Sequence, residues 1–212
     1  MGIVHSRVSG RTSRRWVWRG LLVCLSGIVF FAAVLGIYAI HLQRSAQTLI
    51  ASAKQIGSAA EAEDQIAMWR RRFAGKYSEE LEGYGSRVCE VRLNNRLLYW
   101  LHLVPSTQLA VSVEMREGSL RGVFVVMTTE SNGSASAWVQ ETFVGASRSR
   151  DQKELYVDAR RDGSGRPWKT TVELTSKVPP AEKEKAFALE ARCLVRIRGC
   201  RDAAAILPSV RY

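Results

Sequence analysis

The chain has 212 residues, of which 46% are hydrophobic and 24% charged, and its formal net charge is +11. This composition excludes a wholly disordered chain and leaves enough residues for one domain with its own core. Five of the positive charges fall within residues 1–19, which contain no acidic residue. The charge outside this leader is therefore modest, and we expect no nucleic-acid partner.

The first predicted elements are a basic cytoplasmic leader, residues 1–19, and a transmembrane helix, residues 20–41. Residues 20–40 contain no charge, and Ser26 is their only clearly polar side chain. Such a helix spans roughly 31 Å, about one hydrocarbon core of a bilayer. The apolar stretch is longer than that of a cleaved signal peptide and lacks an A-x-A-like site. The positive-inside rule predicts a single-pass inner-membrane protein with residues 42–212 outside the cytoplasm.

A helical stem and a second helix are predicted for residues 42–75. Apolar residues recur at spacings of four and three, at Leu42, Ala46, Leu49, Ala53, Ile56 and Ala60. This seam either packs on its own domain, which we prefer, or pairs with a second copy. Ala32 and Gly36 offer a further small-residue contact for a homodimer in the membrane. Ser58 and Glu61 form a capping box that starts the second helix, whose buried face is Ile66, Trp69 and Phe73.

An exported α+β domain is predicted for residues 76–212. Alternating apolar residues indicate strands at 87–93, 96–104, 108–117, 120–130, 135–144, 153–160 and 167–175. Turn-forming residues lie between several of these strands, including Asn132-Gly133-Ser134 and Asp162-Gly163-Ser164-Gly165. Short links between successive strands predict an antiparallel meander. Pro179-Pro180 then precedes a predicted C-terminal helix from Ala181 to about Val195.

Cys193 and Cys200 are predicted to form a structural disulfide. The predicted compartment is oxidising, and Gly199 with β-branched neighbours allows the helix to end between the two cysteines. A metal clip and a redox pair are weaker alternatives, since no CxxC motif or full ligand set is present. Cys89 is left over and is interpreted as a buried thiol in a strand, although pairing with either partner stays open.

No catalytic, cofactor-binding or metal-binding residue is predicted. His102 lies in an apolar run and is interpreted as a core or sheet-end histidine rather than a general base. Glu79, Glu80 and Glu82 are interpreted as a solvated loop cluster. Nucleophile elbows and phosphate-binding glycine loops are absent from the sequence.

The run LIASAKQIGSAAEAEDQIAMWRRRF, then NNRLLYWLHLVP and ARCLVRIRGCRDAAAILPSV, resembles uncharacterised membrane-anchored exported proteins of bacteria. This resemblance covers most of residues 42–212 and implies no activity. The layout of a basic leader ending in Gly20, a long apolar helix, a sheet and a C-terminal cysteine pair is also similar to type IV pilin-like proteins. Leu25 stands where that pattern expects a glutamate.

These observations predict a membrane-anchored binding or envelope-associated module, whose partners are the lipid bilayer and an unidentified protein or small ligand. A pilin-like structural subunit and a membrane-anchored enzyme that uses His102 are the alternatives.

Overall fold

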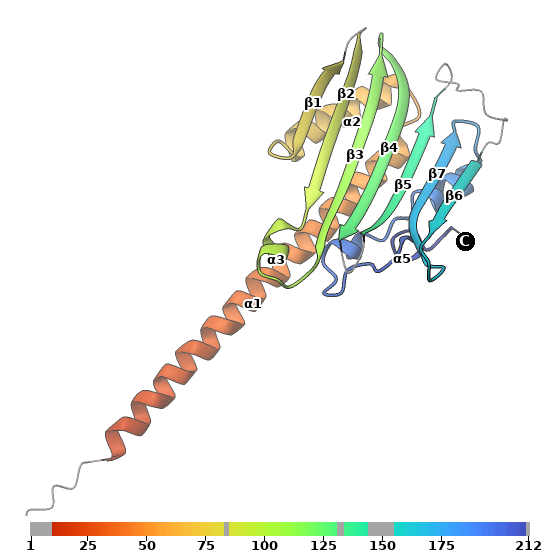
Figure 1. Ribbon diagram of the computed structural model, residues 1–212. Helices are drawn as coiled ribbons and strands as arrows, with labels where there is room; N and C mark the ends of the chain where they lie inside the picture. The colour runs from red at the N-terminus through yellow and green to blue at the C-terminus, as the bar shows by residue number, and fades with distance from the viewer. Residues whose placement is uncertain (1–9, 83–84, 131–133, 144–154, 211–212) are drawn as a thin grey trace, which may run out of the picture. The chain divides into compact units, whose positions relative to one another are not determined.

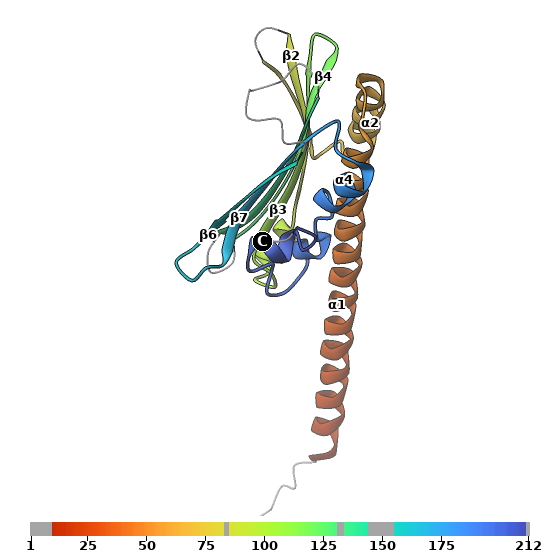
Figure 2. The ribbon, with the colours of Figure 1, turned by 90° about the vertical axis from the view of Figure 1, so that its right-hand side faces the viewer.

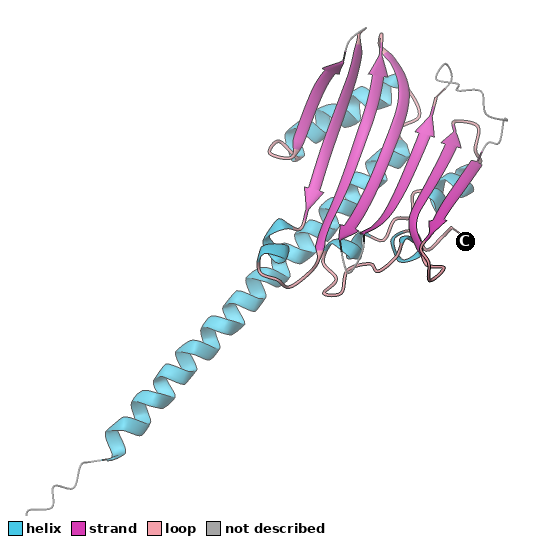
Figure 3. Cartoon of the chain, viewed as in Figure 1, coloured by secondary structure: helices cyan, strands magenta, loops and turns pink. Residues whose placement is uncertain are grey.

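The computed structural model describes residues 10–82, 85–130, 134–143 and 155–210. It divides the chain into two compact units, Met1–Ile40 and His41–Tyr212. Residues 1–9 of the predicted leader and most of the predicted turn at 132–134 lie outside the described residues. The predicted α+β class is confirmed, since helices flank a seven-stranded sheet (Figure 3).

Helix α1 (Gly10–Gln55) begins in the leader, contains the predicted transmembrane segment and ends in the stem (Figure 1). Among the described residues it is the one helix long and apolar enough to span a membrane, with a mean hydropathy that reaches 2.6. Ser26 Oγ donates a hydrogen bond of 2.9 Å to the carbonyl of Val23. The one clearly polar side chain of the apolar stretch is thus satisfied by its own helix, as a lipid environment requires.

The stem part of α1 packs on its own domain. Five of the six seam residues are buried, and Ala60 is exposed: the buried ones are Leu42, Ala46, Leu49, Ala53 and Ile56. Helix α2 (Ala59–Arg72) follows, and its predicted capping box is present. Ser58 Oγ accepts from the Glu61 amide, and the Glu61 carboxylate accepts from the Gly57 amide at 2.7 Å.

Seven strands form one mixed sheet, in the order β1-β2-β3-β4-β5-β7-β6. Their bounds are β1 (Tyr77–Glu82), β2 (Ser86–Asn94), β3 (Ser106–Arg116), β4 (Ser119–Glu130), β5 (Ser134–Thr142), β6 (Leu155–Arg161) and β7 (Pro167–Thr175). The predicted meander holds for β2 to β5, and β1, which was not predicted, extends it; β7, however, lies between β5 and β6 and pairs with β5 in parallel. The prediction of a purely antiparallel sheet is therefore wrong.

The strand predicted at 96–104 is wrong. Residues Arg96–Trp100 form the short helix α3, and a turn leads from it to β3. The apolar run is typical of a buried strand, but Tyr99 and Trp100 are exposed. Asn95 is what sets the local path. Its side-chain oxygen accepts from the Thr107 amide at 3.0 Å, which closes residues 95–105 into a loop that we call the α3 loop.

The predicted C-terminal helix 181–195 is broken in two. Helix α4 (Pro180–Ala186) ends at Phe187, and a 3₁₀ helix, η1 (Ala191–Leu194), follows after three further residues. Phe187 and Leu189 are buried between the two pieces. Helix α5 (Ala203–Ile206) is the last described helix, capped by Asp202, whose carboxylate accepts from the Ala205 amide at 2.7 Å.

The core lies on one face of the sheet. Residues 41–55 of α1, together with α2 and α4, lie on the same side of it (Figure 2). Buried side chains of β2, β3, β4, β5 and β7 alternate with outward ones, as a sheet covered on one face requires. We call the covered side the inner face and the other side the outer face.

Candidate functional site

The predicted disulfide between Cys193 and Cys200 is present. The two Cα atoms lie 5.3 Å apart, and both cysteines are buried. The chain turns back at Gly199, which has a φ of +59°. This left-handed conformation costs glycine little, and it explains how two cysteines seven positions apart meet. We call the segment closed by the disulfide the 193–200 loop.

The 193–200 loop is joined to the α3 loop through Asn95. The Asn95 amide, 1% exposed, donates to the carbonyls of Leu194 at 3.0 Å and Pro105 at 2.8 Å. A β-carbon at Gly199 would lie 2.6 Å from Cγ of Pro105. The two loops therefore pack as one unit at the end of the sheet where β2 ends and β3 begins. We call this the α3 end of the sheet.

His102 is not a core residue, so the core interpretation is wrong, whereas its place before β3 agrees with the sheet-end alternative. It is exposed in the turn after α3 and has a φ of +55°. No ion pair or hydrogen bond joins its ring to another described residue, which leaves a general base without an orienting partner.

A polar cluster that the sequence did not indicate lies at the β1 edge of the inner face. Glu79, on a strand rather than a loop, forms ion pairs with Arg70 and Arg87. Tyr77 Oη donates to Glu79 at 3.0 Å and accepts from Arg70 at 3.2 Å. Cys89 lies opposite Glu79 in the β1–β2 ladder, buried and free as predicted.

The electrostatics of this cluster make it unreactive. Burial raises the pKa of the Cys89 thiol, and the neighbouring Tyr77 hydroxyl only partly opposes this. Burial raises the pKa of Glu79, but the hydrogen bonds from Arg70 and Tyr77 outweigh burial and hold it below its usual range. A protonated thiol is a poor nucleophile, and the carboxylate is already fully paired. The cluster holds β1 against α2.

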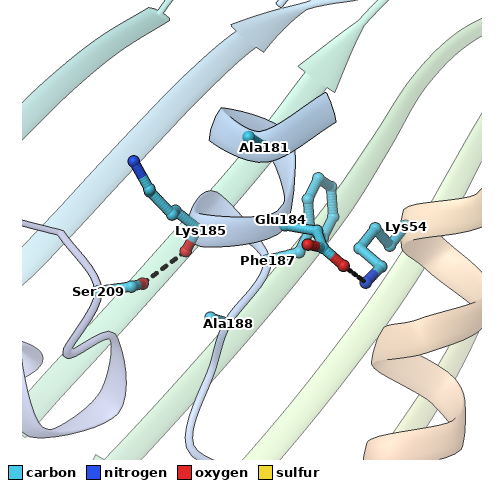
Figure 4. A pocket seen from close by; sticks show the side chains of 7 residues that line it. All are labelled: Lys54, Ala181, Glu184, Lys185, Phe187, Ala188 and Ser209. Carbon is cyan, nitrogen blue, oxygen red and sulfur yellow. Dashed lines mark hydrogen bonds and ion pairs between the residues drawn. The ribbon is translucent and has the colours of Figure 1, made fainter. Parts of the chain in front are cut away.

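One shallow hollow of about 550 Å³ lies between α1, α4 and the C-terminal segment (Figure 4). Its charged groups are already paired, since Lys54 lies 2.9 Å from Glu184. Ser209 is occupied by the carbonyl of Lys185. The hollow offers no free nucleophile or acid–base pair. Among the residues that the structure describes, no group of three or more metal-ligating side chains occurs either.

The outer face carries three aromatic side chains, the half-buried Phe124 and the exposed Trp138 and Tyr156, which we call the aromatic cluster. Trp138 and Tyr156 are 42% and 45% exposed. The strand registers place Tyr156, Glu173, Gln140 and Phe124 in one row across four strands, with Trp138 one row away. Lys169 Nζ lies 4.5 Å from the centre of the Trp138 ring. The three aromatic side chains thus share one face of the sheet, with Glu173 and Gln140 between Tyr156 and Phe124.

The sequence contained a weak signal for this cluster. Trp138 and Phe124 stand at positions that alternate with the buried Val139 and Val125, which by period two places them on the opposite face. Aromatic residues on a solvent face are the unexpected feature, and they become visible only once the register is known.

No protein-family model, curated protein or solved structure matches this chain. The resemblances to exported bacterial proteins and to pilin-like proteins therefore stay predictions.

Proposed function

We propose that the chain is a single-pass membrane-anchored binding module, whose domain lies outside the cytoplasm and binds a partner protein through the outer face of its sheet. The observation that carries this proposal is the aromatic cluster of Phe124, Trp138 and Tyr156 on a sheet face that no described helix covers.

Three features support anchoring and export. The apolar part of α1 meets the length and composition of a membrane span. Arginines precede it, whereas Arg44 is the nearest one after it. The Cys193–Cys200 disulfide is typical of a domain that folds in an oxidising compartment.

The uncovered outer face favours a protein partner over a small ligand. Small ligands are held in concave pockets, whereas protein interfaces have an aromatic centre and a polar rim. Here charged residues of both signs lie on the same face as the aromatic cluster: Lys169, Asp158 and Arg160 lie in neighbouring rows, and Glu173 lies between Tyr156 and Gln140. Lys169 stacked on Trp138 adds a cation–π pair that a partner would bury.

Protease protection tests the topology. A C-terminal tag on the full chain should be removed by protease added to intact spheroplasts, while a cytoplasmic marker survives. A tag that is protected until the membrane is lysed would contradict export.

Site-specific photo-crosslinking in the native host tests the binding face. A photoreactive residue at Thr171, the cross-strand neighbour of Trp138, should give one adduct of defined mass. The adduct should disappear in Trp138→Ala, and the same residue at Glu184 on α4 should not give it. Equal adducts at Thr171 and Glu184, or an adduct that survives Trp138→Ala, would contradict the proposal.

A pilin-like subunit is the second candidate, favoured by one observation: α1 is unbroken from Gly10 to Gln55 and its last part packs on the sheet. That function requires cleavage after Gly20. The intact mass of the purified protein separates the two candidates, because the pilin-like one predicts a chain that begins at Leu21.

A further inference from the structure

We infer that the α3 end of the domain is a lipid-docking surface, which inserts exposed apolar side chains among the anionic headgroups of the membrane that α1 crosses. This inference rests on the anchoring proposed above and goes beyond the protein-binding face.

The apolar part of this surface consists of large side chains that point into solvent. Trp100 is 72% exposed and Ile197 is 79% exposed, and three neighbours in the α3 loop are also exposed: Leu97, Tyr99 and Leu103. Tryptophan and tyrosine are the residues that concentrate at the boundary between headgroups and acyl chains. A soluble surface rarely gathers five such side chains at one tip without a partner.

The charged part of the surface is basic. Arg96 begins α3, and Arg196 and Arg198 flank Ile197, all three exposed. No ion pair joins any of these arginines to another described residue, whereas Arg192 lies 4.0 Å from Glu190. The acidic residues described near this end are Glu130, at the end of β4, and Glu190 and Asp202, which are both used as caps. Basic residues around apolar ones are typical of surfaces that bind anionic lipid.

The surface is rigid, so little order has to be gained on docking. Asn95 ties the α3 loop to η1 through hydrogen bonds to Leu194 and Pro105. The disulfide fixes both ends of the loop that carries Ile197. Preorganised side chains lose less entropy on binding than mobile ones.

The surface lies at the end of the domain that the chain enters from the apolar segment. Lys183 Nζ donates to the Ile56 carbonyl at 3.3 Å and to Glu141 at 3.0 Å. Glu141 is the residue before the last one of β5, so Ile56 lies near the end of that strand. Because β3 and β5 run in the same direction, α3 lies at the opposite end of the sheet from Glu141. His41 lies about 22 Å from Ile56 along the helix. Because the helix runs from Ile56 away from Glu141, His41 lies toward the α3 end of the sheet. Figures 1 and 2 show residues 41–55 running along the sheet in this way.

A photoreactive diazirine residue tests this inference in the purified full chain, reconstituted into vesicles that contain phosphatidylglycerol. We expect lipid adducts by mass spectrometry when it replaces Trp100 or Ile197. Leu81, 82% exposed at the far end of β1, is the matched apolar control and should give none. Ile28, in the apolar part of α1, is the positive control and should give adducts.

The charge contribution has its own arm. Each of Arg96, Arg196 and Arg198 changed to glutamine should lower the ratio of docked to undocked domains by about fivefold. Arg160→Gln on β6 should leave the ratio unchanged. The adduct yield at Ile197 should also fall in vesicles of phosphatidylcholine alone, and equal yields would overturn the role assigned to anionic headgroups.

The outcomes separate this inference from the function on which it rests. Adducts at Ile28, with yields at Trp100 and Ile197 no higher than at Leu81, would overturn the lipid-docking surface and leave the anchor standing. No adducts at Ile28 would overturn both.

Discussion

Gly199 packs directly on the ring of Pro105, with a φ of +59° and no room for a side chain. A β-carbon there would lie 2.6 Å from Cγ of Pro105 and 3.2 Å from the hydroxyl of Thr129. This contact holds the 193–200 loop against the α3 loop, although Gly199 and Pro105 are 94 positions apart in the sequence.

Replacing Gly199 by alanine should destabilise the domain by about 2–4 kcal/mol. The left-handed φ contributes about 1 kcal/mol and the overpacking against Pro105 the rest. Thermal unfolding of the detergent-solubilised protein measures the loss. Gly163→Ala is the matched control, because a β-carbon at Gly163 would have nothing within 4 Å. An unchanged melting temperature for Gly199→Ala would contradict the packing described.

Removing the disulfide should cost about 2.5 kcal/mol, the chain-entropy value for a loop this short. The double variant Cys193→Ala and Cys200→Ala tests this without leaving a lone thiol. Its melting temperature should fall by about 5–10 °C, and reduction of the native protein should give the same fall. A double variant that melts with the native protein would show that the 193–200 loop does not depend on its covalent closure.

Loss of the buried hydrogen bond between Trp69 and Ser52 should destabilise the domain by more than the net energy of one hydrogen bond. Trp69 Nε1 donates to Ser52 Oγ at 2.9 Å, and both side chains are buried. Ser52→Ala leaves the indole N–H without a partner and should cost about 1–3 kcal/mol. Ser45→Ala, on the same helix and equally buried, is the control. Equal losses for the two serines in chemical denaturation would refute the role given to Trp69.

Glu141 should make the stability of the domain depend on pH. Burial raises the pKa of this carboxyl above its usual 4.5, and the hydrogen bond from Lys183 opposes the rise without cancelling it. The stabilisation linked to a raised pKa is complete below 4.5 and is lost as the pH rises through the pKa of the folded state. Glu141→Gln does not titrate, so its stability relative to the native protein should increase from pH 4.5 upward and then level off.

Urea unfolding at a series of pH values measures that difference. Glu182→Gln, which alters the exposed pair with Lys185, supplies the reference for an ion pair in solvent. A stability difference between Glu141→Gln and the native protein that stays constant, or that decreases as the pH rises, would contradict burial that disfavours the charged form of Glu141.

The stem part of α1 and the start of α2 were predictable because their signals are local. The buried seam from Leu42 to Ile56 follows from helical spacing, and Ser58 with Glu61 marks the start of α2 within four residues. The disulfide was predictable for a related reason. Gly199 allows the chain to reverse within the few residues that separate the two cysteines.

The errors arose where distant residues decide the structure. Strand β1 was missed because its residues do not alternate between apolar and polar. The inward position is held by Glu79, whose ion-pair partners come from α2 and β2. Asn95 converts the apolar run 96–104 into a helix and turn through hydrogen bonds to Pro105, Thr107 and Leu194. The parallel pairing of β7 with β5 requires a connection that local turn residues do not specify.

The first core element of the domain precedes Gly57 in the chain. Leu42, Leu49 and Ile56 supply three of its largest fully buried side chains. A water-soluble fragment that starts at Gly57, just after the end of α1, would lack these three side chains and expose the apolar residues of the inner face that they cover. Trimming for crystallisation must therefore retain His41 onward, even though this places the cut inside an unbroken helix.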